Sequence, residues 1–174
     1  CASLGYTECL SYSFIDKKSV EIFSSDTSKE ITLINPISSE MTHMRQSLLP
    51  ALLKIVEKNQ AKGIKSLAIF EQGYCFESNK VGDETYQISA LLTGRKSNFN
   101  LYKEIRPYDI FDIKKDLFKL LSYLNLKVDN LKLERGTPEF LHPKRSAKVM
   151  LGNKIIAMFG EVSPLVAKNY AIRE

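Results

Sequence analysis

Apolar residues recur at helical spacing in three stretches of the chain, each preceded by a residue that caps helices well. Ser47, Asp109 and the pair Ser163-Pro164 are candidate N-termini, while Gly63 and Asn125 are candidate stops for the first two helices. The predicted helices therefore run over residues 47–62, 109–124 and 163–170.

Other stretches alternate between apolar and polar residues or form short apolar runs, as strands do. Strands are predicted over residues 9–15, 20–23, 31–34, 67–70, 86–93, 131–133, 147–151 and 154–159. In the first of these, Leu10, Tyr12 and Phe14 share one face, which predicts a half-buried strand. Gly152-Asn153 is a two-residue hairpin signal between the last two.

The order of these elements predicts an α+β fold. Because most strands follow one another through short turns, we expect a mostly antiparallel sheet with helices packed on it, and not a doubly wound sheet. We find no repeat and no linker that divides the chain, so residues 1–174 are expected to form a single domain.

Composition supports one soluble globular domain. The chain has 174 residues, 44% of them hydrophobic and 26% charged, with 8 Gly, 6 Pro and 3 Cys. These values exclude collagen, low-complexity disorder and a disulfide scaffold. No apolar run approaches the roughly 20 residues that span a bilayer, so no membrane contact is expected. The chain starts at Cys1 without a signal-peptide pattern, and we interpret it as a segment of a longer cytoplasmic protein.

Positive charge is concentrated in one part of the chain. The formal net charge is +5, and residues 95–154 alone carry 14 Lys and Arg against 7 Asp and Glu, a net charge of +7. Clustered positive charge attracts phosphate groups and so favours a nucleic-acid partner. Scattered lysines on a solvated face give the same composition, so both interpretations stay open.

A search for catalytic and metal-binding patterns is negative. The three cysteines and two histidines lack metal-ligand spacing, so no metal site is predicted, and Cys9 and Cys75 are expected to be small buried hydrophobes. No phosphate-binding loop, dinucleotide fingerprint, nucleophile elbow or zinc-protease motif occurs. Glu71 and Glu161 are single carboxylates without a positioned partner, which gives no mechanism.

Several ordered blocks nevertheless carry a family resemblance. They are Leu4-Gly-Tyr-x-Glu8 with Tyr12-Ser-Phe14, Asn35-Pro-x-Ser-x-Glu40, Met44-Arg-x-Ser-Leu-Leu-Pro-x-Leu-Leu53, Phe70-Glu-x-Gly73, Asp109-x-Phe-Asp112, His142-Pro-x-Arg-Ser-Ala147 and Gly160-Glu-x-x-Pro164. Together they span nearly the whole chain and resemble the catalytic-like module of the phenylalanyl-tRNA synthetase beta subunit family. The chain departs from that family in having no Trp before Asp109 and in having Lys144 where many relatives have Gly.

The resemblance implies a fold and a set of partners. It implies a class II aminoacyl-tRNA synthetase-like fold, with an antiparallel sheet flanked by helices, that has lost catalysis. It also implies a catalytic alpha subunit as partner in a two-alpha, two-beta heterotetramer, with tRNA(Phe) bound by the whole enzyme. ATP and Mg²⁺ then belong to the whole enzyme, and no cofactor is expected in this fragment.

For individual residues, the resemblance places Arg45 and Glu71 in blocks similar to degenerate active-site strands. No catalytic, cofactor-binding or metal residue is predicted, since the ATP-binding arginine and the Gly-rich helix motif of class II enzymes are not recognisable. Arg45, Lys144 and Arg145 are candidate contacts to tRNA or to the partner subunit.

Two alternatives to an inactive structural module stay open. In the first, the basic stretch contacts tRNA directly through Lys103, Arg106, Lys144 or Arg145. In the second, the fragment is an active ligase by itself, as biotin and lipoate ligases of similar fold are. The missing Gly-rich motif argues against the second alternative, and ATP–pyrophosphate exchange would decide it.

Overall fold

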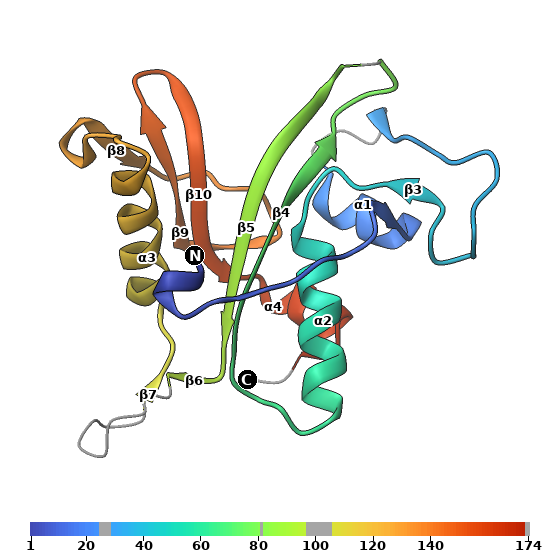
Figure 1. Ribbon diagram of the computed structural model, residues 1–174, viewed down its shortest axis with the longest axis horizontal. Coiled ribbons are helices and arrows are strands. Elements are labelled where there is room, and N and C mark those ends of the chain that lie inside the picture. Colours follow the sequence, from blue (N-terminus) through green and yellow to red (C-terminus); the bar gives the residue numbers. More distant parts are fainter. Residues whose placement is uncertain (25–28, 81, 97–105, 173–174) are drawn as a thin grey trace.

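The computed structural model describes residues 1–24, 29–80, 82–96 and 106–172. Two three-stranded sheets form its frame (Figure 1). The first has the order β1-β4-β5, with β1 at Thr7–Glu8, β4 at Leu67–Phe76 and β5 at Glu84–Thr93. The second has the order β10-β9-β8, with β8 at Leu131–Glu134, β9 at Leu141–Leu151 and β10 at Lys154–Val162.

Smaller elements complete the described chain. Two short ribbons pair β2 (Phe14–Ile15) with β3 (His43–Met44) and β6 (Arg95–Lys96) with β7 (Arg106–Pro107). The α-helices are α1 (Lys17–Phe23), α2 (Leu49–Ala61), α3 (Ile110–Tyr123) and α4 (Pro164–Asn169). Two 3₁₀ turns are η1 (Ala2–Leu4) and η3 (Val128–Asn130).

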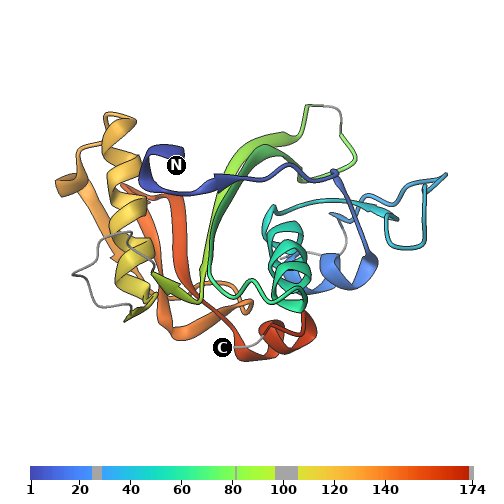
Figure 2. The same ribbon diagram turned by 60° about the horizontal axis from the view of Figure 1, so that its bottom comes forward.

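The predicted α+β class with mostly antiparallel sheets is confirmed. The pairs β4–β5, β8–β9 and β9–β10 are antiparallel, while β1 pairs with β4 in parallel. Helix α2 lies beside the β4–β5 sheet and α3 lies against β9 and β10 (Figures 1 and 2). Each sheet thus has its own helix, and the two hairpins diverge from a common base (Figure 1).

Two buried clusters explain why these helices form where they do. The larger cluster joins α1, α2, α4 and the first sheet through apolar side chains: Phe23, Leu52, Leu53, Val56, Ile69, Leu91, Val166 and Tyr170. The smaller cluster joins α3 to the second sheet through Leu121, Val149 and Phe159. The helical stripes in the sequence are therefore the faces that leave water on folding.

Most of the local signals at the helix ends work as predicted, but Leu48 and not Ser47 is the N-cap residue of α2. Asp109 forms a capping box with Asp112, and Asn125 ends α3 with a positive φ of 59°. Pro50 lies in the first turn of α2, where the Ser47 hydroxyl accepts a hydrogen bond from the Leu49 amide. The Gly152-Asn153 hairpin between β9 and β10 is also confirmed.

Four predictions near the N-terminus and in the basic turn are wrong. Residues 9–15 do not form one strand: only Phe14–Ile15 are extended, as β2, and residues 9–13 connect it to β1, with Leu10 93% exposed. Residues 20–23 belong to α1, because the Asp16 carboxylate caps the Ser19 amide and starts a helix. In the stretch 31–34, only an isolated bridge from Thr32 to His43 forms. The basic turn after Leu141 lies within β9 itself.

Candidate functional site

Arg45 and Glu71 form a buried ion pair that connects separate segments of the chain. Arg45 follows β3 and is 4% exposed, whereas Glu71 lies on β4 and is 0% exposed. The Arg45 Nη1 atom lies 2.7 Å from Glu71 Oε1, and its Nε donates to the Tyr74 carbonyl at 2.9 Å. Ser11 donates to the same carboxylate from its amide at 3.2 Å and from its hydroxyl at 2.8 Å. We call these four residues the Arg45 network.

The sequence around β4 makes room for the guanidinium. A side chain at Gly73 would collide with the Arg45 Nη2 atom, so this strand position needs a residue without a Cβ. The charges of the network are compensated inside the domain, which is the condition for keeping an ion pair away from water. In this arrangement the guanidinium is already bonded to Glu71 and to the strand carbonyl at Tyr74.

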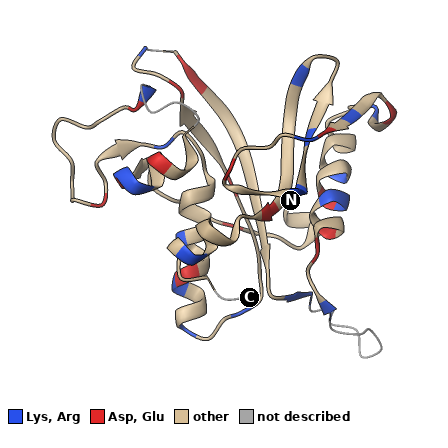
Figure 3. Ribbon diagram, turned by 180° about the vertical axis from the view of Figure 1, so that it is seen from behind, with Lys and Arg blue, Asp and Glu red and all other residues tan. Residues whose placement is uncertain are grey.

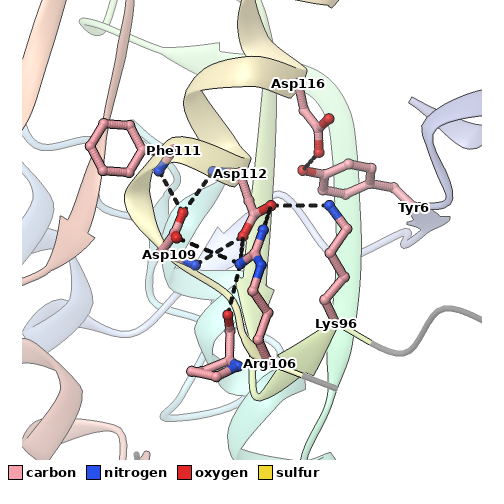
Figure 4. Close-up of polar contacts among 8 residues, drawn as sticks. Tyr6, Lys96, Arg106, Asp109, Phe111, Asp112 and Asp116 are labelled. Carbon is pink, nitrogen blue, oxygen red and sulfur yellow. Dashed lines mark hydrogen bonds and ion pairs between the residues drawn. The ribbon is translucent and has the colours of Figure 1, made fainter. Parts of the chain in front are cut away.

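A second charged cluster joins the β6–β7 ribbon to the first turn of α3 (Figure 4). The Asp112 carboxylate accepts two hydrogen bonds of 2.6 Å from Arg106 and one of 3.0 Å from Lys96. It also accepts a hydrogen bond of 3.1 Å from the Asp109 amide. Hydrogen bonding from Arg106, helped by Lys96, outweighs burial and holds the pKa of Asp112 well below its usual range. These four residues form the Asp112 cluster.

Tyr6 adds a contact from the N-terminal segment to the same helix. Its hydroxyl donates to Asp116 Oδ2 at 2.9 Å (Figure 4). Burial, followed by the hydrogen bond to Asp116, raises the pKa of Tyr6 well above its usual value. Both acidic side chains of α3 therefore point to partners on neighbouring segments (Figure 4).

The basic residues of the His142 block lie at the surface of β9. Arg145 Nε lies 2.5 Å from Glu161 Oε2 on β10, and Lys144 is exposed. The His142 Nδ1 atom accepts hydrogen bonds from the Lys144 and Arg145 amides at 3.1 and 3.2 Å. The pairing of β9 with β10 brings Arg145 and Glu161 together, although the sequence shows no link between them.

The residues predicted to contact tRNA or a partner subunit lie in different environments. Arg45 is buried and Arg145 is ion-paired, whereas Lys144 is exposed; their predicted contacts to tRNA or a partner stay predictions. Arg106 is bonded to Asp112, and Lys103 lies outside the described residues. The Asp112 cluster was missed by sequence reasoning, although the spacing of Asp109 and Asp112 is that of a capping box.

Neither cluster resembles a metal centre. Within residues 1–24, 29–80, 82–96 and 106–172, no group of three His, Cys, Asp or Glu side chains is placed to hold a metal ion. Among the helices of the described part of the chain, none combines the length and the apolar content needed to cross a membrane.

Comparisons with known proteins agree on one family. A family model described as the phenylalanyl tRNA synthetase beta chain CLM domain matches residues 1–174. The phenylalanine–tRNA ligase beta subunit of Ruegeria pomeroyi is 40% identical over 166 residues, which cover 95% of this chain and 21% of that protein. The beta subunit from Cereibacter sphaeroides is 37% identical over 172 residues, which cover 99% of this chain and 21% of that protein.

The similarity to solved structures concerns the fold alone. Pyrrolysyl-tRNA synthetase from Desulfitobacterium hafniense matches with a TM-score of 0.70 at 15% sequence identity, covering 99% of this chain and 58% of that chain. The chain spans about a fifth of the length of the curated relatives, so most of each relative lies outside the matched region.

Proposed function

The chain belongs to the phenylalanyl-tRNA synthetase beta chain CLM domain family, and on that premise we propose that it is a structural, catalytically inactive module of a phenylalanine–tRNA ligase beta subunit. In this proposal it packs on the catalytic alpha subunit of a cytoplasmic two-alpha, two-beta enzyme that uses ATP to attach phenylalanine to tRNA(Phe). ATP and Mg²⁺ act elsewhere in that enzyme.

The Arg45 network is the observation that carries the inactive role. Arg45 is the arginine of the block that resembles an active-site strand, yet its guanidinium is buried and bonded to Glu71. An arginine that serves a substrate phosphate needs donors aimed at open space, because its energy of interaction comes from charge-assisted bonds to the ligand. Here those donors are used to hold β4 against the segment after β3.

An exposed aromatic surface supports packing against another protein chain. Tyr74 and Tyr86 are a cross-strand pair on β4 and β5, 53% and 61% exposed, with ring centroids 5.0 Å apart. Ile88, two residues further along β5, is also exposed on this face. Contiguous exposed apolar side chains are typical of interaction sites, and aromatic residues often dominate their binding energy.

Assembly of full-length subunits tests the packing role. Replacing Tyr74 and Tyr86 together by Ser is expected to weaken alpha–beta association by more than about tenfold, the loss that one or two aromatic anchors produce. Leu165→Ser is a matched control, because Leu165 is exposed on α4, away from this hairpin. Unchanged association of the tyrosine variant, or normal assembly after deletion of the whole module, would contradict the packing role.

Turnover tests the inactive role separately. The double variant Arg45→Met with Glu71→Gln removes both charges and keeps a polar partner for Ser11. If the network is structural, the assembled enzyme keeps its kcat for aminoacylation within about twofold, since no transition-state contact is lost. A large loss of kcat in an enzyme that still assembles would instead assign a catalytic role to this pair.

A further inference from the structure

The outward side of α3 combines lysines with an exposed aromatic ring. Residues that fall within one arc of about 140° on a helical wheel form what we call the α3 outer face. They are Phe111, Lys114, Lys115, Phe118, Lys119 and Ser122. Phe111 is 71% exposed, and its ring points away from the Asp112 cluster (Figure 4). Phe118 is partly buried against the smaller core cluster, so the face presents one exposed ring, Phe111, together with lysines. Blue segments recur along α3 in Figure 3.

The positive charge of this face is not compensated by its own helix. The acidic residues within α3 are Asp112 and Asp116. Asp112 is bonded to Arg106 and Lys96, and Asp116 accepts the hydrogen bond from Tyr6. Because Asp112 is neutralised by these two cations, the three lysines leave α3 with a surplus of positive charge that attracts anions.

The lysines and the rings are interleaved. Lys114 Nζ lies 5.9 Å from the centroid of the Phe118 ring, and Lys119 Nζ lies 6.0 Å from that of Tyr123. Each ammonium group therefore lies over the ring of its own aromatic neighbour as a cation–π contact, and the exposed Phe111 ring is not one of these two. Aromatic faces that stack bases, combined with cations that bind phosphates, are the two parts of a single-strand nucleic-acid site.

We propose that the α3 outer face binds a single-stranded or loop segment of RNA, with a base stacked on Phe111 and phosphates on Lys115 and Lys119. The choice of RNA over an acidic protein rests on the proposed function, since the ligase must handle a tRNA. The physical features of the face favour the same choice. A protein partner would need carboxylates matched to each lysine, whereas every nucleotide carries both an anion and a stacking surface.

The experiment measures tRNA(Phe) binding to the enzyme assembled from full-length subunits, at salt concentrations from about 50 to about 300 mM. Lys115→Gln with Lys119→Gln is expected to reduce the slope of log affinity against log salt by about 1.4–1.8, the contribution of two phosphate contacts. Lys58→Gln with Lys62→Gln is the matched control, because these exposed lysines have the same spacing at the end of α2. The control is expected to leave the slope unchanged.

Two substitutions at Phe111 test stacking without changing charge. Phe111→Leu is expected to lower tRNA affinity about fivefold or more, as loss of one stacked base does, whereas Phe111→Tyr keeps the ring and the affinity. Both changes lie at an exposed position, so neither is expected to disturb folding. Equal affinities for the two variants would overturn the stacking part of the proposal.

The results also separate this proposal from the proposed function. A salt slope that is the same for the Lys115/Lys119 variant and the control overturns the RNA site. Loss of alpha–beta assembly in the α3 variants, with tRNA affinity per assembled enzyme unchanged, identifies the face as a protein contact and likewise overturns it. Neither outcome bears on Tyr74, Tyr86 or the Arg45 network, whose tests are assembly and kcat.

Discussion

Removing Arg45 is the sharpest test of how the domain is held together. Arg45→Met keeps an unbranched apolar stem similar to that of arginine but removes the guanidinium that faces Glu71. The carboxylate then keeps only its hydrogen bonds from Ser11, in a position that is sealed from water. The variant should therefore be destabilised by a stranded charge and not by a cavity.

The expected size of this effect follows from the geometry. Two unit charges about 4 Å apart attract by about 4 kcal/mol at an effective dielectric constant of about 20. Removing one partner of a buried pair costs about 3–5 kcal/mol, and the bonds from Ser11 place the expected loss near 3 kcal/mol. Since a domain has only about 5–15 kcal/mol of stability in total, this is a large fraction. Adding Glu71→Gln should restore about 2 kcal/mol, because a neutral amide costs less to bury.

Urea denaturation of the 174-residue chain, followed by circular dichroism, measures the free energies of unfolding without adding salt. Lys17→Met is the control, since Lys17 Nζ lies 3.9 Å from Glu21 in an exposed ion pair. An exposed pair contributes little, so this variant should change the free energy of unfolding by less than about 0.5 kcal/mol.

Two results would refute this reasoning. One is a loss of less than about 1 kcal/mol in the free energy of unfolding for Arg45→Met, with an unchanged dependence on urea. The Glu71 carboxylate would then be hydrated, either in place or after a local movement of the chain. The other is a double variant with Glu71→Gln that is no more stable than the single one, which would mean that the cost comes from lost packing around the arginine.

Other predictions concern single positions. Gly73→Ala should lower the free energy of unfolding by about 1–3 kcal/mol, as seen in thermal melts, because its methyl group meets the Arg45 guanidinium; an unchanged melt would contradict the close approach. Asp112 has a pKa that Arg106 holds below the unfolded value of about 3.9, so its stabilising contribution is present above about pH 4 and lost on further acidification. Arg106→Gln should therefore flatten the stability–pH curve between about pH 4 and about pH 2. Burial raises the pKa of Cys75 to about 11, so its alkylation at about pH 8 should await unfolding, and rapid labelling of the native chain would contradict this.

Sequence reasoning succeeded where the signal lies within a few residues. The cap at Asp109, the stop at Asn125 and the hairpin at Gly152 are each encoded by adjacent side chains and backbone preferences. It failed between residues 17 and 23, where a short apolar run fits a strand or one turn of helix equally well. The Asp16 cap and the packing of Phe23 into the larger core decided for the helix.

The polar networks show what the sequence could not determine. Glu71 looks like a polar residue at the end of an apolar strand, yet β4 continues to Phe76 and buries it opposite an arginine 26 positions earlier. Tyr6 and Asp116 are 110 positions apart and meet only because η1 and β1 lead the chain past α3.

The sequence by itself thus determined the family, the helix ends and the antiparallel hairpins, because backbone hydrogen bonds and caps depend on near neighbours. Tertiary structure alone decided which charges are neutralised. Arg45 and Arg106 are both arginines in a basic chain, but each is matched by a carboxylate that only the path of the chain brings within hydrogen-bond distance. Within the described residues of α3, Lys115 and Lys119 make no ion pair with the carboxylates of their own helix, because Asp112 is bonded to Arg106 and Lys96 and Asp116 accepts the hydrogen bond from Tyr6.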